Sequence, residues 1–188
     1  MRALLVAVVT AVLALPTLPA LADDILDAIE QGRKAYQQGD LAGAKQSLDL
    51  ASQLIGQKNA ETFVKLLPEP LPGWKGEEPQ TTAVGAVGFG LSSASRRYSN
   101  QKGDNVEVQI TGDSVLITQF ATLLANPQIA GAMGKIVRVG NQRAIQSSQG
   151  DVHVIVNNKF LVMVTGSGSA KDKLAYAGAI DFAKLSKM

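Results

Sequence analysis

Side chains that could do chemistry are scarce in this sequence. The chain has 188 residues with one histidine, His153, and no cysteine, so disulfides, thiolate nucleophiles and cysteine-containing zinc sites are excluded. His153 stands between Val152 and Val154 in an expected strand, and its side chain should point away from theirs. We interpret it as a surface or structural histidine. The alternative is the base of a Ser-His-Asp hydrolase, although no Gly-x-Ser-x-Gly motif accompanies it.

Two glycine-containing segments resemble ligand-binding loops only superficially. The run 82–91 has neither Gly-x-Gly-x-x-Gly spacing nor a lysine, so a nucleotide site is not indicated. This run is either a bulged edge strand or a loop that offers Val87, Phe89 and Leu91 to a partner. The segment 166–171 departs from P-loop spacing, which favours a capped strand-to-helix connection over an anion site.

Three further side chains are candidates for binding. Trp74 is the only tryptophan and is expected to anchor the chain on the core, with ligand stacking as the other possibility. Arg96 and Arg97 are adjacent in an expected strand, so they should point to opposite faces. One of them could turn inward to a carboxylate such as Asp181. A surface pair of arginines is favoured, because Lys184 lies three residues from Asp181 on a helix and can bridge it locally.

Composition limits the possible ligands. One histidine cannot build a histidine-rich metal site, and no loop has the carboxylate spacing of an all-oxygen site, so we expect no metal and no cofactor. The formal net charge is +2 and no basic block occurs, which argues against nucleic acid. An envelope protein is the expected kind of partner.

The N-terminus predicts export. Met1 and Arg2 precede an apolar stretch, and Ala20-Leu21-Ala22 has the small-x-small pattern that signal peptidase cleaves. We predict a signal peptide over 1–22, a mature chain that begins at Asp23, and a periplasmic location. No later stretch is apolar for long enough to span a bilayer, so no integral membrane segment is expected after cleavage.

The segment 23–67 predicts a helical hairpin followed by a short helix. Gly39-Asp40 marks the exit of one helix and the cap of the next, and Asn59 is expected to cap a short helix over 60–67. The run 32–41, with small and apolar residues behind it, resembles one tetratricopeptide repeat. One repeat cannot bury its own faces. We therefore expect the hairpin to pack on the following domain, with a peptide-binding array as the alternative.

The remainder predicts a Pro-rich linker over 68–76 and an antiparallel α+β domain over 77–188. Alternating apolar residues and turn signals predict strands at 92–98, 105–111, 135–139, 143–147, 152–156 and 160–165. The last of these is apolar on both faces and should be central. Two amphipathic helices, one after Ser114 and one capped by Ser169, should cover the sheet. The fold class is α+β: a helical hairpin followed by an antiparallel sheet flanked by helices.

From Gly73-Trp74 onward the chain resembles the PsbP-like proteins, in its early tryptophan, its hairpins, and its final apolar strand followed by a terminal helix. The resemblance implies an antiparallel sheet between helices and a small extracytoplasmic accessory or binding domain. Together these patterns predict a soluble exported binding or accessory protein of the cell envelope without enzymatic activity. The alternative is an envelope hydrolase that uses His153.

Overall fold

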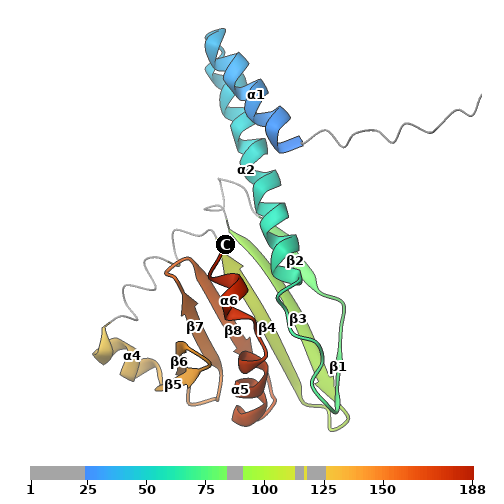
Figure 1. Cartoon of the computed structure of the whole chain (residues 1–188), viewed down its shortest axis with the longest axis vertical. Coiled ribbons are helices and arrows are strands. Elements are labelled where there is room, and N and C mark those ends of the chain that lie inside the picture. Colours follow the sequence, from blue (N-terminus) through green and yellow to red (C-terminus); the bar gives the residue numbers. More distant parts are fainter. Residues whose placement is uncertain (1–23, 84–90, 113–116, 118–125) are drawn as a thin grey trace, which may run out of the picture.

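The protein combines a sheet-and-helix body with a long projecting hairpin. The computed structural model describes residues 24–83, 91–112, 117 and 126–188. An antiparallel sheet carries helices on one face, and two N-terminal helices extend away from one end of it (Figure 1). The class is therefore α+β with an N-terminal helical hairpin, as predicted.

The hairpin consists of α1 (Asp24–Gln37) and α2 (Leu41–Val64). Gly39 adopts a positive φ of 81° at the tip, which a glycine accepts without strain. Asp40 caps α2, because its carboxylate accepts a 2.9 Å hydrogen bond from the backbone N–H of Gly43. The helix α2 has 24 residues and so is about 36 Å long at 1.5 Å per residue.

The separate helix over 60–67 does not exist. α2 runs through Asn59 without a break and ends at Val64. Asn59 is a good helix cap, but it is followed by Ala60 and Glu61, which favour helix interiors. Packing adds to this, since Ala60 and Phe63 are almost completely buried.

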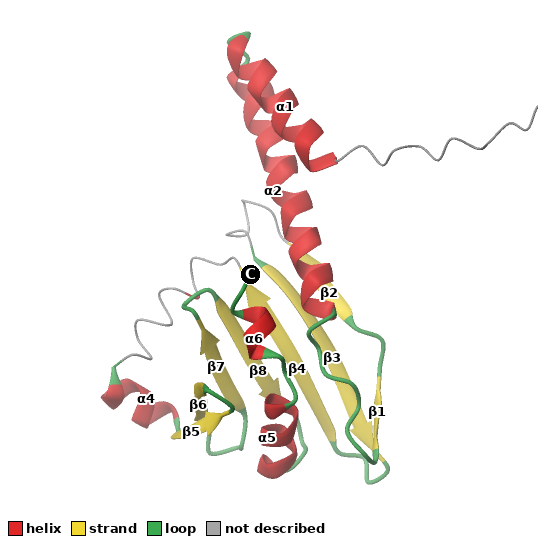
Figure 2. Ribbon diagram, in the orientation of Figure 1, coloured by secondary structure: helices red, strands yellow, loops and turns green. Residues whose placement is uncertain are grey.

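The sheet has the strand order β1-β3-β4-β8-β7-β6-β5, and β2 pairs with the same edge of β3 as β1 does (Figure 2). Every pairing is antiparallel. The strands are β1 (Trp74–Gly76), β2 (Gln80–Ala83), β3 (Ser92–Asn100), β4 (Asn105–Gly112), β5 (Lys135–Val139), β6 (Gln142–Gln146), β7 (Val152–Val156) and β8 (Phe160–Thr165). The six predicted strands are all present within two residues at each end, and β8 is central between β4 and β7, as predicted.

Two details of the chain path differ from the sequence prediction. Trp74–Gly76 belong to the sheet, since they pair with β3, and not to a free linker. Pro127 begins the helix α4 (Pro127–Met133), where we expected Asn126-Pro127 to end a helix. Proline suits the first helical position because the backbone N–H there has no helical partner. The predicted helix after Ser114 lies outside the described residues except for Ile117, which is buried.

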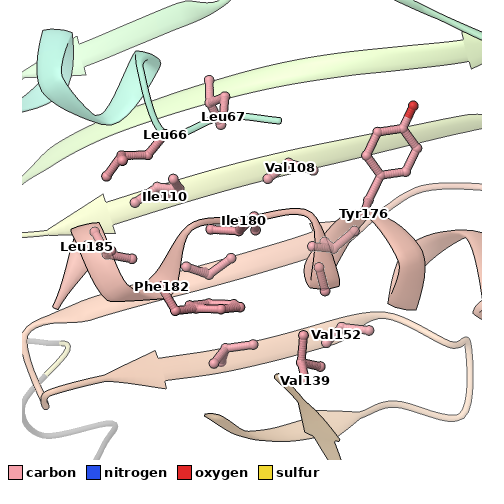
Figure 3. Close-up of a cluster of buried hydrophobic side chains, with 14 of the residues drawn as sticks. Leu66, Leu67, Val108, Ile110, Val139, Val152, Tyr176, Ile180, Phe182 and Leu185 are labelled. Atoms are coloured by element: carbon pink, nitrogen blue, oxygen red, sulfur yellow. The ribbon is translucent and has the colours of Figure 1, made fainter. Parts of the chain in front are cut away.

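The core lies between the sheet and the helices on one face (Figure 3). Alternate residues of the strands point into it, including Val108 and Ile110 of β4 and Val152 of β7. The opposing layer is formed by the end of α2, the segment after it, and two C-terminal helices. Its buried members include Phe63, Leu66, Leu67, Tyr176, Ile180, Phe182 and Leu185.

The C-terminal layer is two helices instead of one. They are α5 (Ala170–Gly178) and α6 (Phe182–Leu185). Ser169 caps α5 in a capping box with Asp172, as predicted. Asp181 caps α6 through the backbone N–H of Lys184 at 3.0 Å. The break between the helices turns Ile180 and Phe182 toward the core.

Candidate functional site

Trp74 joins an aromatic cluster between α5 and the end of β3 that lies away from the hairpin (Figure 1). Its ring meets Tyr176 edge-on at 5.6 Å between centroids, and Tyr176 lies 4.4 Å from Tyr98. Both tyrosines are fully buried. The Tyr98 hydroxyl donates a 2.6 Å hydrogen bond to the Pro68 carbonyl, and the Tyr176 hydroxyl accepts one from the Leu71 N–H at 3.3 Å. The cluster therefore fastens the 68–74 segment to the core.

Arg96 and Arg97 point to opposite faces of β3, as their alternation predicts. Arg96 turns to the core side, where its guanidinium carbon lies 5.6 Å from the centre of the Tyr98 ring. It donates to the Glu77 carbonyl at 2.9 Å and to the Glu69 carboxylate at 3.3 Å. The favoured surface pair of arginines is therefore wrong for Arg96, whose side chain is 18% exposed, and its carboxylate partner is Glu69 and not Asp181. The Asp181 carboxylate pairs with Lys184 at 3.2 Å, the local bridge that we expected.

Burial raises the pKa of Tyr98, and the positive charge of Arg96 beside it opposes that shift. Burial raises the pKa of Tyr176 as well. Both phenols are therefore neutral at physiological pH, and the Tyr98 O–H is a hydrogen-bond donor. A neutral, packed phenol stabilises structure and does not act as a base here.

Arg97 lies beside a small polar pocket on the other face of the sheet. It pairs with Glu107 at 2.9 Å, and this carboxylate raises its pKa. The pocket has a volume of about 80 Å³, and its lining also includes Glu77, Glu78, Gln80 and Ser95. Ligand sites generally measure about 300–1,000 Å³. The pocket around Arg97 is therefore too small for an organic ligand of ordinary size.

His153 lies on the sheet face opposite the core, as predicted, and is half-buried. Its neighbours across the strands are Ile145 and Met163. Burial lowers its pKa, while the charge of Asp151 opposes that shift. In the described part of the chain no serine or carboxylate is hydrogen-bonded to it, so the arrangement is not that of a nucleophile and its base.

Backbone N–H groups of the loop between β8 and α5 donate hydrogen bonds to acceptors within the protein. The Gly168 N–H donates to the Asn105 carbonyl at 2.8 Å, and the Ser169 N–H donates to the Asp172 carboxylate at 3.2 Å. These internal acceptors occupy the amides that an anion would need. The segment is a capped connection.

Of the three apolar binding candidates in the glycine-containing run 82–91, the structure describes only Leu91. Val87 and Phe89 lie outside the described residues. Leu91 is half-buried immediately before β3.

The hairpin carries the most distinctive surface of the described molecule. Its seam is made of small residues, with Ala28 and Gly32 of α1 packed against Ala44 and Ala51 of α2. Large apolar side chains flank this seam and stay between 41% and 67% exposed. We call this set the hairpin stripe; it consists of Ile29, Tyr36, Leu41, Leu48 and Ile55.

The stripe residues lie on one side of the hairpin. Leu41, Leu48 and Ile55 follow each other at two-turn intervals, and a helix brings such residues to the same side. Ile29 and Tyr36 have the same spacing on α1. The two rows adjoin because Leu48 lies over Gly32, where an added Cβ would be 3.1 Å from Leu48 Cγ. The hairpin stripe is thus continuous across both helices.

The sequence indicated these side chains but not their exposure. By spacing alone, Ile29 and Tyr36 share one face of the first helix with Gly32, and Leu41, Leu48 and Ile55 share one face of the second with Ala44 and Ala51. The seam is filled by alanine and glycine, and only the lower half of α2 contacts the sheet (Figure 1). The hairpin therefore packs on the domain at its base alone, and its distal half projects.

Metal sites, membrane spans and similarity to known proteins complete the description. Among the described residues, no group of three or more acidic or histidine side chains is arranged to hold a metal ion, and none of the helices in these ranges could cross a membrane by length and apolarity. Comparison with protein families, with curated proteins and with solved structures finds no match for this chain.

Proposed function

We propose that the protein is an exported, non-enzymatic binding or accessory protein of the cell envelope, and that its hairpin docks on a protein partner. The observation that carries this proposal is the hairpin stripe. The largest apolar patch on a monomeric protein is often a site of contact with another molecule. The N-terminal signal pattern supports export to the envelope.

The shape of the hairpin supports the same function. Two helices that project from a packed domain present a long, narrow surface, and helical partners bind such surfaces through residues spaced by one and two turns. The seam beneath the stripe is closely packed, since Leu48 covers Gly32. Preorganised helices lose little conformational entropy when a partner binds.

A hydrolase based on His153 has less support. The side chain lies between Ile145 and Met163 in the strand pairing, and the small pocket is lined by residues of the β1–β4 region instead. A base needs its nucleophile within hydrogen-bond reach.

A capture experiment with matched variants tests the proposed function. Protein purified from the periplasm is immobilised and incubated with envelope extract, in its natural form and as Leu48→Gln and Gln53→Ala variants. Gln53 is exposed and lies about 140° round α2 from Leu48. The proposal expects Leu48→Gln to lose specifically captured proteins, while Gln53→Ala retains them and both variants melt as the natural form does.

The same experiment can contradict the proposal. Capture that is equal for all three forms means that the hairpin stripe is not the binding surface. A second assay screens esterase, phosphatase, peptidase and glycosidase substrates. Turnover that disappears in His153→Ala would favour the hydrolase.

A further inference from the structure

We infer that the open edge of the sheet at β5 binds an extended acidic segment of another protein, which pairs with β5 as an additional antiparallel strand. β5 is the last strand in the sheet order, and among the described strands only β6 pairs with it. α2 packs mainly on β2 and β3, at the other end of that order (Figure 2). This surface is therefore separate from the hairpin stripe, and the inference goes beyond the proposed function without depending on it.

The backbone groups of Ile136 and Arg138 point away from β6. Hydrogen-bonded and non-hydrogen-bonded pairs alternate along an antiparallel ladder. The N–H of Ser147, just after β6, donates to the Asp151 carbonyl on the β7 side at 2.8 Å, so odd-numbered residues of β6 bond to β7 and even-numbered ones to β5. The partners of the even-numbered residues in β5 are Lys135, Val137 and Val139. Ile136 and Arg138 therefore present their N–H and C=O groups to the open edge, where another strand can pair with them.

The side chains of β5 alternate between two different surroundings. Ile136 is 45% exposed, and Arg138 is exposed on the same side of the strand. Val137 points the other way and packs against the core. A strand paired with β5 would place its own side chains on these two sides in turn. The edge therefore suits a segment in which apolar residues alternate with residues that match Arg138.

Arg138 has no acidic partner among the described residues. It lies directly opposite Arg143 in the β5–β6 pairing, and both side chains are exposed. Like charges in directly opposite positions destabilise a sheet. Neither arginine forms an ion pair within the described ranges, whereas Arg33, Arg96 and Arg97 each pair with a glutamate. A carboxylate beside Arg138 on an added strand would supply the missing counter-charge.

The charge around β5 has one sign over a long stretch of the chain. Residues 114–150 include Lys135, Arg138 and Arg143 but no aspartate or glutamate. Exposed charges interact over about 10 Å at moderate ionic strength, so these cations act together on a segment that lies along the edge. They attract an acidic segment and repel a basic one.

Charge also decides between an acidic segment and a second copy of this chain. Cationic residues at the edge of a sheet commonly prevent unwanted pairing with other edges. Two β5 strands paired with each other would bring in Lys135 and Arg138 a second time without an acid, which raises the Coulomb energy. An acidic strand instead forms cross-strand pairs of opposite charge. The same cations therefore reject one kind of strand and select the other.

Binding of defined peptides to the full mature protein tests the inference. The probe is the fluorescently labelled peptide Thr-Val-Glu-Val-Glu-Val-Thr, and its matched control has lysine in place of both glutamates. We expect saturable binding of the acidic peptide, measured by fluorescence anisotropy. Binding of the basic peptide should be weaker by about tenfold or more.

Methylated forms of the acidic peptide test the backbone pairing. In the antiparallel pair the two glutamates lie opposite Ile136 and Arg138, so their N–H groups face β5, and the valine N–H groups point away from it. Methylation of both glutamate nitrogens should abolish binding, whereas methylation of two valine nitrogens should not. The reverse result would overturn the antiparallel arrangement.

Substitutions at the edge separate backbone pairing from charge. Ile136→Pro removes an N–H that faces outward, a position where an edge strand tolerates proline, and it should abolish binding of the acidic peptide while Ile136→Ala retains it. Arg138→Glu places a carboxylate opposite Arg143, so the variant should fold, and it should weaken binding by about tenfold or more. Lys171→Glu, at an exposed position on α5, makes the same change of charge elsewhere and should leave the affinity unchanged.

Hydrogen exchange locates the bound peptide. With saturating acidic peptide, the amides of Ile136 and Arg138 should exchange more slowly by about tenfold. The amides of Val137 and Val139 already bond to β6 and should change little. Binding without this protection, or binding that both methylated peptides retain, would mean attraction by charge alone and would overturn the added strand.

Other outcomes overturn the inference as well. These are no saturable binding of the acidic peptide, equal binding of both peptides, and self-association of the natural protein that Ile136→Pro abolishes in sedimentation equilibrium, which would make a second copy the occupant. The hairpin variant Leu48→Gln should bind the acidic peptide as the natural protein does. Failure of the peptide experiment therefore leaves the proposed function standing, and the capture experiment can fail without affecting this inference.

Discussion

Tyr98 and Pro68 are joined by a 2.6 Å hydrogen bond in which the buried phenol donates to the proline carbonyl. The two residues are thirty positions apart, and the contact connects β3, the strand next to the β1 edge of the sheet, to the chain that leaves α2. Pro68 is itself buried. The start of the Pro-rich segment is therefore part of the packed core.

The variant Tyr98→Phe tests this contact. It removes the donor but keeps the ring, so the buried Pro68 carbonyl loses its best partner. We expect the free energy of unfolding to fall by about 1–3 kcal/mol, measured by urea denaturation. Tyr36→Phe is the matched control, because that ring is 67% exposed, and its stability should not change. Equal stabilities for Tyr98→Phe and the natural protein would mean that the hydrogen bond contributes nothing.

The buried ammonium of Lys173 supports a second prediction. Its side chain is 2% exposed and lies 2.6 Å from Asp151, which is 27% exposed, and it also donates to the Gln149 carbonyl at 2.9 Å. Asp151→Asn leaves the buried cation without its counter-charge and should cost about 3 kcal/mol. Lys173→Met removes the buried charge itself and should cost less. The reverse order in thermal or urea unfolding would contradict this account.

His153 predicts a pH dependence of stability. Burial lowers its pKa from the ordinary value of 6.5, so between the folded and unfolded pKa values the unfolded chain binds more protons. Stability then rises with pH in that window and is lost as the pH falls below 6.5. From about pH 7 to pH 5, the natural protein should lose more stability than His153→Gln, which does not titrate. A loss that is equal in both proteins would show that His153 does not contribute.

The signal-peptide pattern gives the fourth prediction. Cleavage after Ala22 would yield a mature chain that begins at Asp23, the residue immediately before α1. Intact-mass measurement of protein from the periplasm should give the mass of 23–188. A mass that includes Met1, or protein that resists carbonate extraction of membranes, would contradict the signal peptide.

Local signals predicted much of this fold. Turn signals at Gly150-Asp151 and Asn157-Asn158 predicted the bounds of β7, and the place of His153 between Val152 and Val154 predicted the face that it occupies. Asn157 and Asn158 predicted a tight turn, and both have positive φ, 51° and 54°. Ser169 and Asp172 predicted the capping box at α5. Each of these features depends on residues close in sequence.

Features that depend on distant residues could not be predicted in this way. Asn59 has the local appearance of a cap, but the fit of Ala60 and Phe63 on the sheet keeps α2 continuous. Arg96 contacts Glu69 and the Tyr98 ring because the 68–73 segment folds back on the sheet. The periodicity of apolar residues does not predict this path of the chain. Periodicity also identified the apolar faces of the hairpin without showing which side chains the seam would cover.

The continuity of α2 links the two halves of the molecule mechanically. Its lower end is clamped on the sheet: Phe63 meets Phe160 edge-on at 5.8 Å, and Gly56 lies so close to Ser92 that an added Cβ would be 3.2 Å from the serine oxygen. Its upper end carries Leu41 and Leu48. One residue inserted between them and the clamp would turn the stripe by about 100° and advance it by about 1.5 Å. The number of residues in α2 therefore determines both the direction that the hairpin stripe faces and its distance from the sheet.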